Sequence, residues 1–283
     1  MNSGSKVVEY RRGGKKYPVP EGKMCPAGGG GMWVRDTAED SKPSLILVHG
    51  WGVDSLINWG GTIESLRASH RVVAIDLPGH GFSDPVRPFK ITEVAEAIIE
   101  ATKGIGIEGP IIAGYSLGGA VALHVAERLG TNCRGIVAAA TGARLVRTFG
   151  MGGVSLAGKV LSAGLGKRPS VVEEKPVVSD KAHLIQTIFR HDDTTLGEAL
   201  QEAAKFDGRG TAGGLNVPAA CIITTTDGVV HHSLQRELAE LLRARVWEVD
   251  ASHDYCMKPE FAETMVEAVK FVGESGTFGR GES

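Results

Sequence analysis

Short runs of apolar, β-forming residues alternate with longer amphipathic stretches from residue 32 onward. The apolar runs predict buried strands over residues 45–48, 72–75, 110–113, 136–139, 219–226 and 246–249. The stretches between them predict helices over residues 55–69, 92–102, 117–129, 233–244 and 259–271. Continuous apolar strands that alternate with helices are typical of an α/β fold with a mostly parallel central sheet flanked by helices. Such a sheet carries its active site at the carboxyl ends of its strands.

Two segments depart from this rhythm. Residues 1–31 are basic and then glycine-rich, which predicts a loosely attached N-terminal arm whose Arg11, Arg12, Lys15 and Lys16 form a solvated charged surface. Residues 142–216 contain no clear strand and predict an inserted helical cap. The core is then formed by residues 32–141 and 217–283.

Composition restricts the classes of function. Lys plus Arg total 31 and Asp plus Glu 33, so no strong basic field exists that would bind nucleic acid. The four cysteines have neither the spacing of a zinc site nor that of a disulfide framework, and no metal or cofactor is expected. The charged N-terminus and the lack of ~20 consecutive apolar residues predict a cytoplasmic chain with no signal peptide and no membrane span.

The sharpest chemical signal is the sequence GYSLG at residues 114–118, between a predicted strand and a predicted helix. A strand-to-helix turn of this kind presents the hydroxyl of Ser116 on a tight bend, and the glycines let the two backbones approach each other. The alternative interpretation is a serine that caps a helix after a glycine turn. In the predicted context, we expect Ser116 to be a nucleophile.

A nucleophilic serine needs a base to accept its proton. Among the nine histidines, His253 follows the last predicted strand, so its loop opens on the same edge of the sheet as Ser116. The histidines at positions 70, 124, 183 and 191 fall on predicted helices or away from strand ends. His253 is therefore the predicted base, with a surface or packing role as the alternative.

The histidine in turn needs an acid that fixes its tautomer. Asp227 follows the predicted strand 219–226, and the chain order Ser, Asp, His is the one expected for a G-x-S-x-G hydrolase. Asp76, Asp250 and Asp254 are alternatives. Asp227 is favoured because it stands at a strand end of its own.

Acyl transfer also requires backbone N–H groups that stabilise a developing oxyanion. Leu117 is expected to supply one, as the residue after the nucleophile. Trp51, in the HGWG sequence after the first predicted strand, is expected to supply the other. The Trp51 indole would then form an apolar wall of the pocket or act as a simple packing aromatic.

These residues resemble the serine-nucleophile, esterase- and lipase-like branch of the α/β-hydrolase superfamily. The motifs that carry the resemblance are, in chain order, HGWG at 49–52, DLPGHGFS at 76–83, GYSLGG at 114–119, Asp227 and His253. The resemblance implies the α/β-hydrolase fold with an eight-stranded sheet, a helical cap, and covalent Ser-His-Asp catalysis without a cofactor. The chain departs from the family pattern at His231 and His232, where a proline is usual, and in the polar sequence after His253.

The resulting hypothesis is a serine hydrolase that cleaves a carboxylic ester or thioester with an apolar moiety, through an acyl-enzyme on Ser116. The apolar cap segment around Phe149 and Leu156 favours such a substrate, or packs the cap onto the core. Because residue 116 is a serine, the activities of family members that use an aspartate nucleophile are excluded. Carbon–carbon bond hydrolysis, acyl transfer, and ligand binding with little turnover are the alternatives on the same residues.

Overall fold

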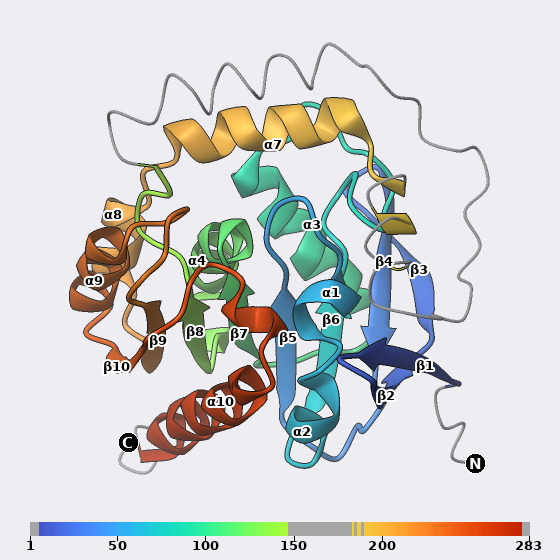
Figure 1. The fold of residues 1–283 in the computed structure, drawn as a ribbon, viewed down its shortest axis with the longest axis horizontal. Coiled ribbons are helices and arrows are strands. Elements are labelled where there is room, and N and C mark those ends of the chain that lie inside the picture. Colours follow the sequence, from blue (N-terminus) through green and yellow to red (C-terminus); the bar gives the residue numbers. More distant parts are fainter. Residues whose placement is uncertain (1–5, 147–182, 184–185, 188–189, 279–283) are drawn as a thin grey trace.

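The computed structural model describes residues 6–146, 183, 186–187 and 190–278. Within these residues, an eight-stranded sheet occupies the centre of the molecule, in the order β10-β9-β8-β7-β5-β6-β4-β3 (Figure 1). Its strands are β3 (Gly22–Ala27), β4 (Gly30–Asp36), β5 (Ser44–Val48), β6 (Arg71–Ile75), β7 (Ile111–Tyr115), β8 (Gly135–Ala139), β9 (Ala219–Thr224) and β10 (Arg245–Val249). Strands β5 to β10 run parallel to one another. At one edge of the sheet, β4 pairs antiparallel with β6, and β3 pairs antiparallel with β4.

The mostly parallel sheet expected from the sequence is confirmed. Each of the six predicted strands coincides with one of β5 to β10 to within about two residues. Every residue of β5 to β9 is buried, which accounts for their uninterrupted apolar runs. The carboxyl ends of these strands consequently meet at one edge of the sheet, where the candidate residues were expected.

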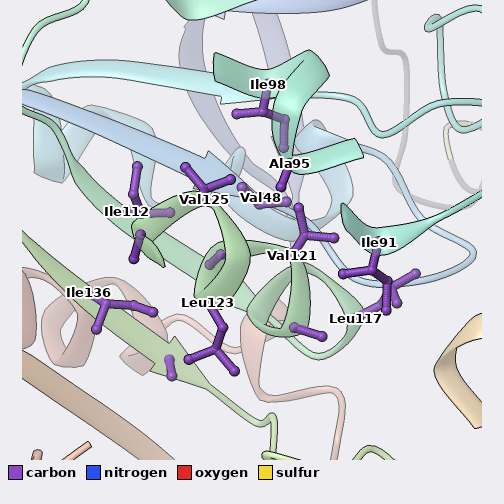
Figure 2. Packing of buried hydrophobic residues seen from close by; sticks show 14 of the residues in the cluster. Val48, Ile91, Ala95, Ile98, Ile112, Leu117, Val121, Leu123, Val125 and Ile136 are labelled. Atoms are coloured by element: carbon purple, nitrogen blue, oxygen red, sulfur yellow. The ribbon is translucent and has the colours of Figure 1, made fainter. Parts of the chain in front are cut away.

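Helices cover both faces of the sheet. One face carries α3 (Ile91–Gly104), α4 (Leu117–Leu129), α8 (Arg209–Gly214) and α9 (His232–Leu241). Figure 2 shows side chains of α3 and α4 packed together over Val48, Ile112 and Ile136 of the strands. The other face carries α1 (Ser55–Trp59), α2 (Ile63–Arg67) and α10 (Glu260–Phe278). No helix in the described part of the chain is long and apolar enough to span a membrane.

The helix predicted over residues 55–69 is wrong as a single element. It is divided into α1 and α2 at Gly60 and Gly61, two residues that weaken a helix. A side chain at Gly60 would overlap the ring of Tyr10, so this break also makes room for the N-terminal segment.

The N-terminal segment is more ordered than the loosely attached arm expected from its composition. Strands β1 (Val7–Arg12) and β2 (Lys15–Pro20) form a hairpin beside α1 and α2 (Figure 1). Tyr10 and Val19 of this hairpin are buried in the same core cluster as α1, α2 and α10. Burial of these two side chains, with the partly buried Val8 and Tyr17 packed beside them, attaches the hairpin to the core.

The glycine-rich run also has a structural role. Gly28 and Gly29 have positive φ angles of 61° and 77° and form the turn between β3 and β4. The expected boundary at residue 31 therefore falls inside β4, and residues 22–36 belong to the central sheet.

Most of the segment expected to form a cap lies outside the described residues, and this includes the apolar residues 149–161. Its described part contains α7 (Asp193–Lys205), which lies above the core in Figure 1, and α8. Hydrogen bonds attach α7 and its N-terminus to core loops, including two from Arg87 to the Asp192 carboxylate at 2.6 Å. Others join Asp192 N to Gly79 O at 2.8 Å, the Trp51 indole to Leu196 O at 2.9 Å, and Phe89 N to Glu198 at 2.8 Å.

A buried ionic cluster adds to this attachment. Asp54, at the N-cap of α1, accepts hydrogen bonds from Thr187 and Arg190 and contacts His183 Nε2 at 3.1 Å. Burial alone would raise the pKa of Asp54, but His183 and Arg190 hold it well below its ordinary value. The Asp54 carboxylate therefore stays ionised while buried between core and cap.

We expect Asp54→Asn to lower the free energy of unfolding by about 3–5 kcal/mol at neutral pH, because it leaves the buried charge of Arg190 uncompensated. The pKa of Asp54 in the folded protein lies below its ordinary value of 3.8. The stabilisation by the Asp54 carboxylate is therefore present above pH 3.8 and is lost as the pH falls through the folded-state pKa. Urea unfolding at several pH values measures the difference.

The control is Glu202→Gln, which removes a more exposed core-to-cap ion pair with Lys90. It should change the free energy of unfolding by at most about 1 kcal/mol. Equal effects of the two substitutions would contradict the role given to the buried cluster.

Candidate active site

Ser116 lies at the turn between β7 and α4, where the sequence predicted it. Its backbone has φ 54° and ψ −122°, a conformation that a residue with a side chain rarely adopts. Its N–H donates to Ala139 O at 3.0 Å, and its carbonyl accepts from the Thr141 hydroxyl at 2.8 Å. These bonds to β8 and the segment that follows it hold the strained turn in place.

Three glycines make this turn sterically possible. A side chain at Gly114 would overlap the backbone at Gly118, and one at Gly118 would overlap the carbonyls of Val48 and His49. A side chain at Gly119 would overlap Thr141. The start of α4 can therefore approach the ends of β5 and β7 only because these positions lack Cβ atoms.

His253 lies between Ser116 and Asp227. Its Nε2 is 2.9 Å from Ser116 Oγ, and its Nδ1 is 2.7 Å from Asp227 Oδ2. Because the carboxylate can only accept, Nδ1 carries the proton and Nε2 is left to accept from the serine hydroxyl. The three side chains come from loops after β7, β9 and β10, which the parallel sheet brings to one edge.

Asp227 is held by bonds to both of its oxygens. Oδ1 accepts from Val229 N and Val230 N at 2.8 and 2.9 Å, and Oδ2 also accepts from the Thr224 hydroxyl at 2.7 Å. Burial alone would raise the pKa of Asp227, but the hydrogen bond and charge of His253, with the bonds from Thr224 and Val229, lower it. The carboxylate is therefore ionised and fixed in orientation.

Asp76 and Asp254, two of the three alternative acids, have other partners, and the third, Asp250, is exposed. Asp76 accepts from Ser55 N and Phe82 N, and thereby organises the turn after β6. Asp254 binds Ser252 and Lys258 at the surface. Asp227 is the carboxylate that the structure joins to His253.

Tyr115 is a neighbour of the site that sequence reasoning missed. Its hydroxyl donates to His253 O at 2.9 Å and accepts from Cys256 N at 3.3 Å. Burial raises the pKa of Tyr115, so the phenol stays protonated and keeps this donor. A variable position inside the G-x-S-x-G motif gives no sequence signal for such a role, because the bonds are made to backbone atoms.

The loop of residues 49–52 lies directly against Ser116. A Cβ atom at Gly50 would be 3.2 Å from Ser116 Cβ, so the glycine allows this approach. Leu77 N donates to His49 Nε2 at 2.8 Å, which leaves the proton on Nδ1 to donate to Gly50 O at 2.7 Å. Gly50 N in turn donates to Asn58 Oδ1 at 3.0 Å. His49 is thus a structural residue of this loop.

The two expected oxyanion donors are placed by different elements. Leu117 is the first residue of α4, so its N–H is among those with no acceptor inside the helix. Trp51 belongs to the 49–52 loop, and its indole is fixed to α7 through Leu196 O. Within the part of the chain that the structure describes, no group of three or more His, Cys, Asp or Glu side chains could hold a metal ion.

This arrangement of sheet, turn and loops defines an α/β hydrolase. The chain matches the Alpha/beta hydrolase family over residues 45–266 and belongs to that family. It is 40% identical over 89 residues to a pimeloyl-[acyl-carrier protein] methyl ester esterase of Nitrosospira multiformis. That match covers 30% of this chain and 34% of the relative, so the chain spans about a third of the curated relative's length.

Solved structures show the same fold. The enol-lactonase from Burkholderia xenovorans LB400 superposes with a TM-score of 0.74 at 23% identity, covering 88% of this chain and all (100%) of that one. An esterase from Exiguobacterium antarcticum gives a TM-score of 0.74 at 16% identity, with coverage of 88% and 100%. The α/β-hydrolase fold inferred from the motifs is therefore confirmed.

The tight packing of the serine turn can be tested through its glycines. We expect Gly118→Ala to lower the free energy of unfolding by about 1–3 kcal/mol, because the added methyl group overlaps backbone carbonyls that cannot move aside. Gly104→Ala in α3 is the control, since a Cβ atom there meets no atom within 4 Å. It should change stability by less than about 1 kcal/mol. Denaturant unfolding compares the two, and an unchanged stability of Gly118→Ala would contradict the proposed packing.

Proposed function

We propose that the protein is a serine hydrolase that cleaves a carboxylic ester through an acyl-enzyme on Ser116. The observation that carries this proposal is the continuous line of hydrogen bonds from Ser116 through His253 to Asp227, at 2.9 and 2.7 Å. Hydrogen-bonded serine, histidine and carboxylate are the groups that activate a hydroxyl for attack on a carbonyl.

In the first half of the reaction, His253 Nε2 takes the proton of Ser116 Oγ as the oxygen attacks the carbonyl carbon. The ionised Asp227 stabilises the imidazolium that forms. The negative charge on the carbonyl oxygen is stabilised by the backbone N–H groups of Leu117 and Trp51 and by the N-terminus of α4. His253 then gives its proton to the departing alcohol, and the acyl group remains on Ser116.

In the second half, water replaces the alcohol. His253 accepts a proton from the water as its oxygen attacks the acyl carbon, and the same two N–H groups stabilise the second oxyanion. Return of the proton to Ser116 Oγ releases the carboxylic acid. The side chains of this chain thus complete the cycle without a cofactor.

The relatives favour an ester as the substrate. A methyl ester and an enol lactone, after which two of these relatives are named, are both carboxylic esters. Within that class, we propose an ester with an apolar moiety, because the cap segment 149–161 carries apolar residues and few charges. A thioester would react by the same steps.

The first test is hydrolysis of p-nitrophenyl esters over a series of acyl chain lengths. We expect turnover that falls by on the order of 10⁴ or more in Ser116→Ala, because the attacking oxygen is lost. The chain length with the highest kcat/KM then measures the acyl pocket. Ser275→Ala is the matched control, since that hydroxyl donates to a carbonyl of its own helix, Phe271 O at 2.8 Å.

Turnover in Ser116→Ala equal to that of the wild type would contradict the proposal. A folded wild type that is labelled at Ser116 by a serine-directed phosphonate but hydrolyses no ester would instead favour carbon–carbon bond cleavage, acyl transfer or ligand binding.

A second prediction concerns the acid. We expect Asp227→Asn to lower kcat by about 10⁴-fold, because an amide partner favours the wrong tautomer of His253. In the wild type, the lowered pKa of Asp227 keeps this carboxylate ionised, so it should not add a second proton to the loss of activity in acid. The logarithm of kcat/KM should therefore fall with a slope of about one as the pH decreases. A slope of two would mean that a second group, with Asp227 as the first candidate, titrates in the same range.

A further inference from the structure

Arg12, at the end of β1, is bonded in a way that its charged neighbourhood does not suggest. Its Nη1 donates to Cys256 O at 2.9 Å, and its Nη2 donates to Ile57 O and, at 3.4 Å, to Leu56 O. Nε and Nη2 also donate to the hydroxyl of Tyr10, at 3.1 and 2.7 Å. The expectation that Arg12 belongs to a solvated charged surface is therefore wrong. By contrast, its neighbour Arg11 pairs with Glu9 on the exposed face of the hairpin.

The carbonyls that Arg12 binds belong to the two segments beside the candidate site. Leu56 and Ile57 lie in α1, whose Asn58 accepts from Gly50 N and so holds the 49–52 loop. Cys256 lies in the short helix η2 (Tyr255–Met257), which begins two residues after His253. The Arg12 guanidinium thus joins α1, which holds the loop of the expected oxyanion donor Trp51, to η2, which follows the expected base His253.

The second segment is connected to the base by a short series of bonds. Cys256 O accepts from Arg12, Cys256 N donates to the Tyr115 hydroxyl, and that hydroxyl donates to His253 O. Displacement of η2 would therefore change the position of the His253 backbone, and with it the 2.9 Å contact between Nε2 and Ser116 Oγ.

The chemistry of this contact requires a guanidinium. Its planar fork can donate to carbonyls on two different segments at once, whereas a lysine ammonium is a point charge on a flexible stem. The carbonyls at the carboxyl end of a helix favour a cation, and Leu56 O accepts from Arg12 in addition to Gly60 N at 2.9 Å. Tyr10 is buried, and its ring centroid lies 5.3 Å from the Arg12 guanidinium carbon, which fixes the fork in place.

We propose that Arg12 is a positioning residue, which sets the separation between the 49–52 loop and the His253 loop. This role rests on the proposed function, since it concerns the same Ser116 chemistry. Acyl transfer depends on reacting groups held within a fraction of an ångström, and a shift of about 1 Å can reduce the rate about 10²-fold. The N-terminal hairpin is then a brace for the catalytic loops, although it contributes no side chain to the chemistry.

The test compares Arg12→Met and Arg12→Lys with the matched control Arg11→Met. Each variant is titrated with a serine-directed phosphonate, so that kcat is expressed per reactive Ser116, and the rate constant of labelling is recorded. Arg12→Met should lower kcat and the labelling rate constant by about 10- to 100-fold. KM should stay within about twofold, because no bond to the substrate is removed.

Arg12→Lys should recover part of the loss in kcat, since it restores one cationic donor but not the fork. Arg11→Met should behave as the wild type. The melting temperature of each variant separates folding from positioning: a purely structural role lowers the melting temperature and the fraction of labelled protein but leaves kcat per labelled site unchanged.

The outcomes distinguish the two proposals. A wild type that labels at Ser116, with Arg12→Met equal to it in kcat per site and in labelling rate constant, overturns the positioning role alone. A folded wild type that neither labels at Ser116 nor hydrolyses esters overturns the proposed function, and the positioning role with it. Three results together support the positioning role. They are a loss of kcat per labelled site in Arg12→Met, a partial recovery of kcat in Arg12→Lys, and an unchanged kcat in Arg11→Met.

Discussion

The site depends on one strained residue. Ser116 has a positive φ of 54°, a backbone conformation that costs about 1–3 kcal/mol and persists only where the surroundings enforce it. Close backbone packing enforces this conformation. The start of α4 lies against the ends of β5 and β7, so that the neighbouring backbone leaves no room for a side chain at Gly114 or Gly118. Bonds to Ala139 and Thr141 hold the turn from the β8 side. The parallel sheet is thus the source of the geometry at the serine.

The loops around Ser116 are held mainly by bonds to backbone atoms. The 49–52 loop is organised by His49 and Asn58, and the loop after β9 by Asp227 acting on Val229 and Val230. Tyr115 and Arg12 do the same for the segment after β10. Of these side chains, Asp227 also takes part in the proposed reaction, whereas the other four hold loops without doing so. The candidate site is therefore assembled from loops that are each held by hydrogen bonds of their own.

This division explains which parts the sequence could predict. The strands β5 to β9 were predictable because burial on both faces leaves a continuous apolar run, whereas β10 is only partly buried. Ser116, Asp227 and His253 follow from their places at strand ends. The antiparallel strands β3 and β4 were missed because glycine, proline and polar residues mask their alternation. Arg12 was misinterpreted because a cation in a basic hairpin has the same pattern whether it faces solvent or binds carbonyls. Bonds to backbone acceptors leave no residue pair in the sequence to find.

The hydrogen bond from the Trp51 indole to Leu196 O joins α7 to the loop beside the nucleophile. By thermodynamic linkage, the effect of α7 on the 49–52 loop equals the effect of the loop on α7. A ligand that shifts α7 changes the conformational equilibrium of the 49–52 loop, and a transition-state analogue that orders this loop protects α7 from local opening to the same extent. The position of α7 and the conformation of the loop beside Ser116 are in this way coupled.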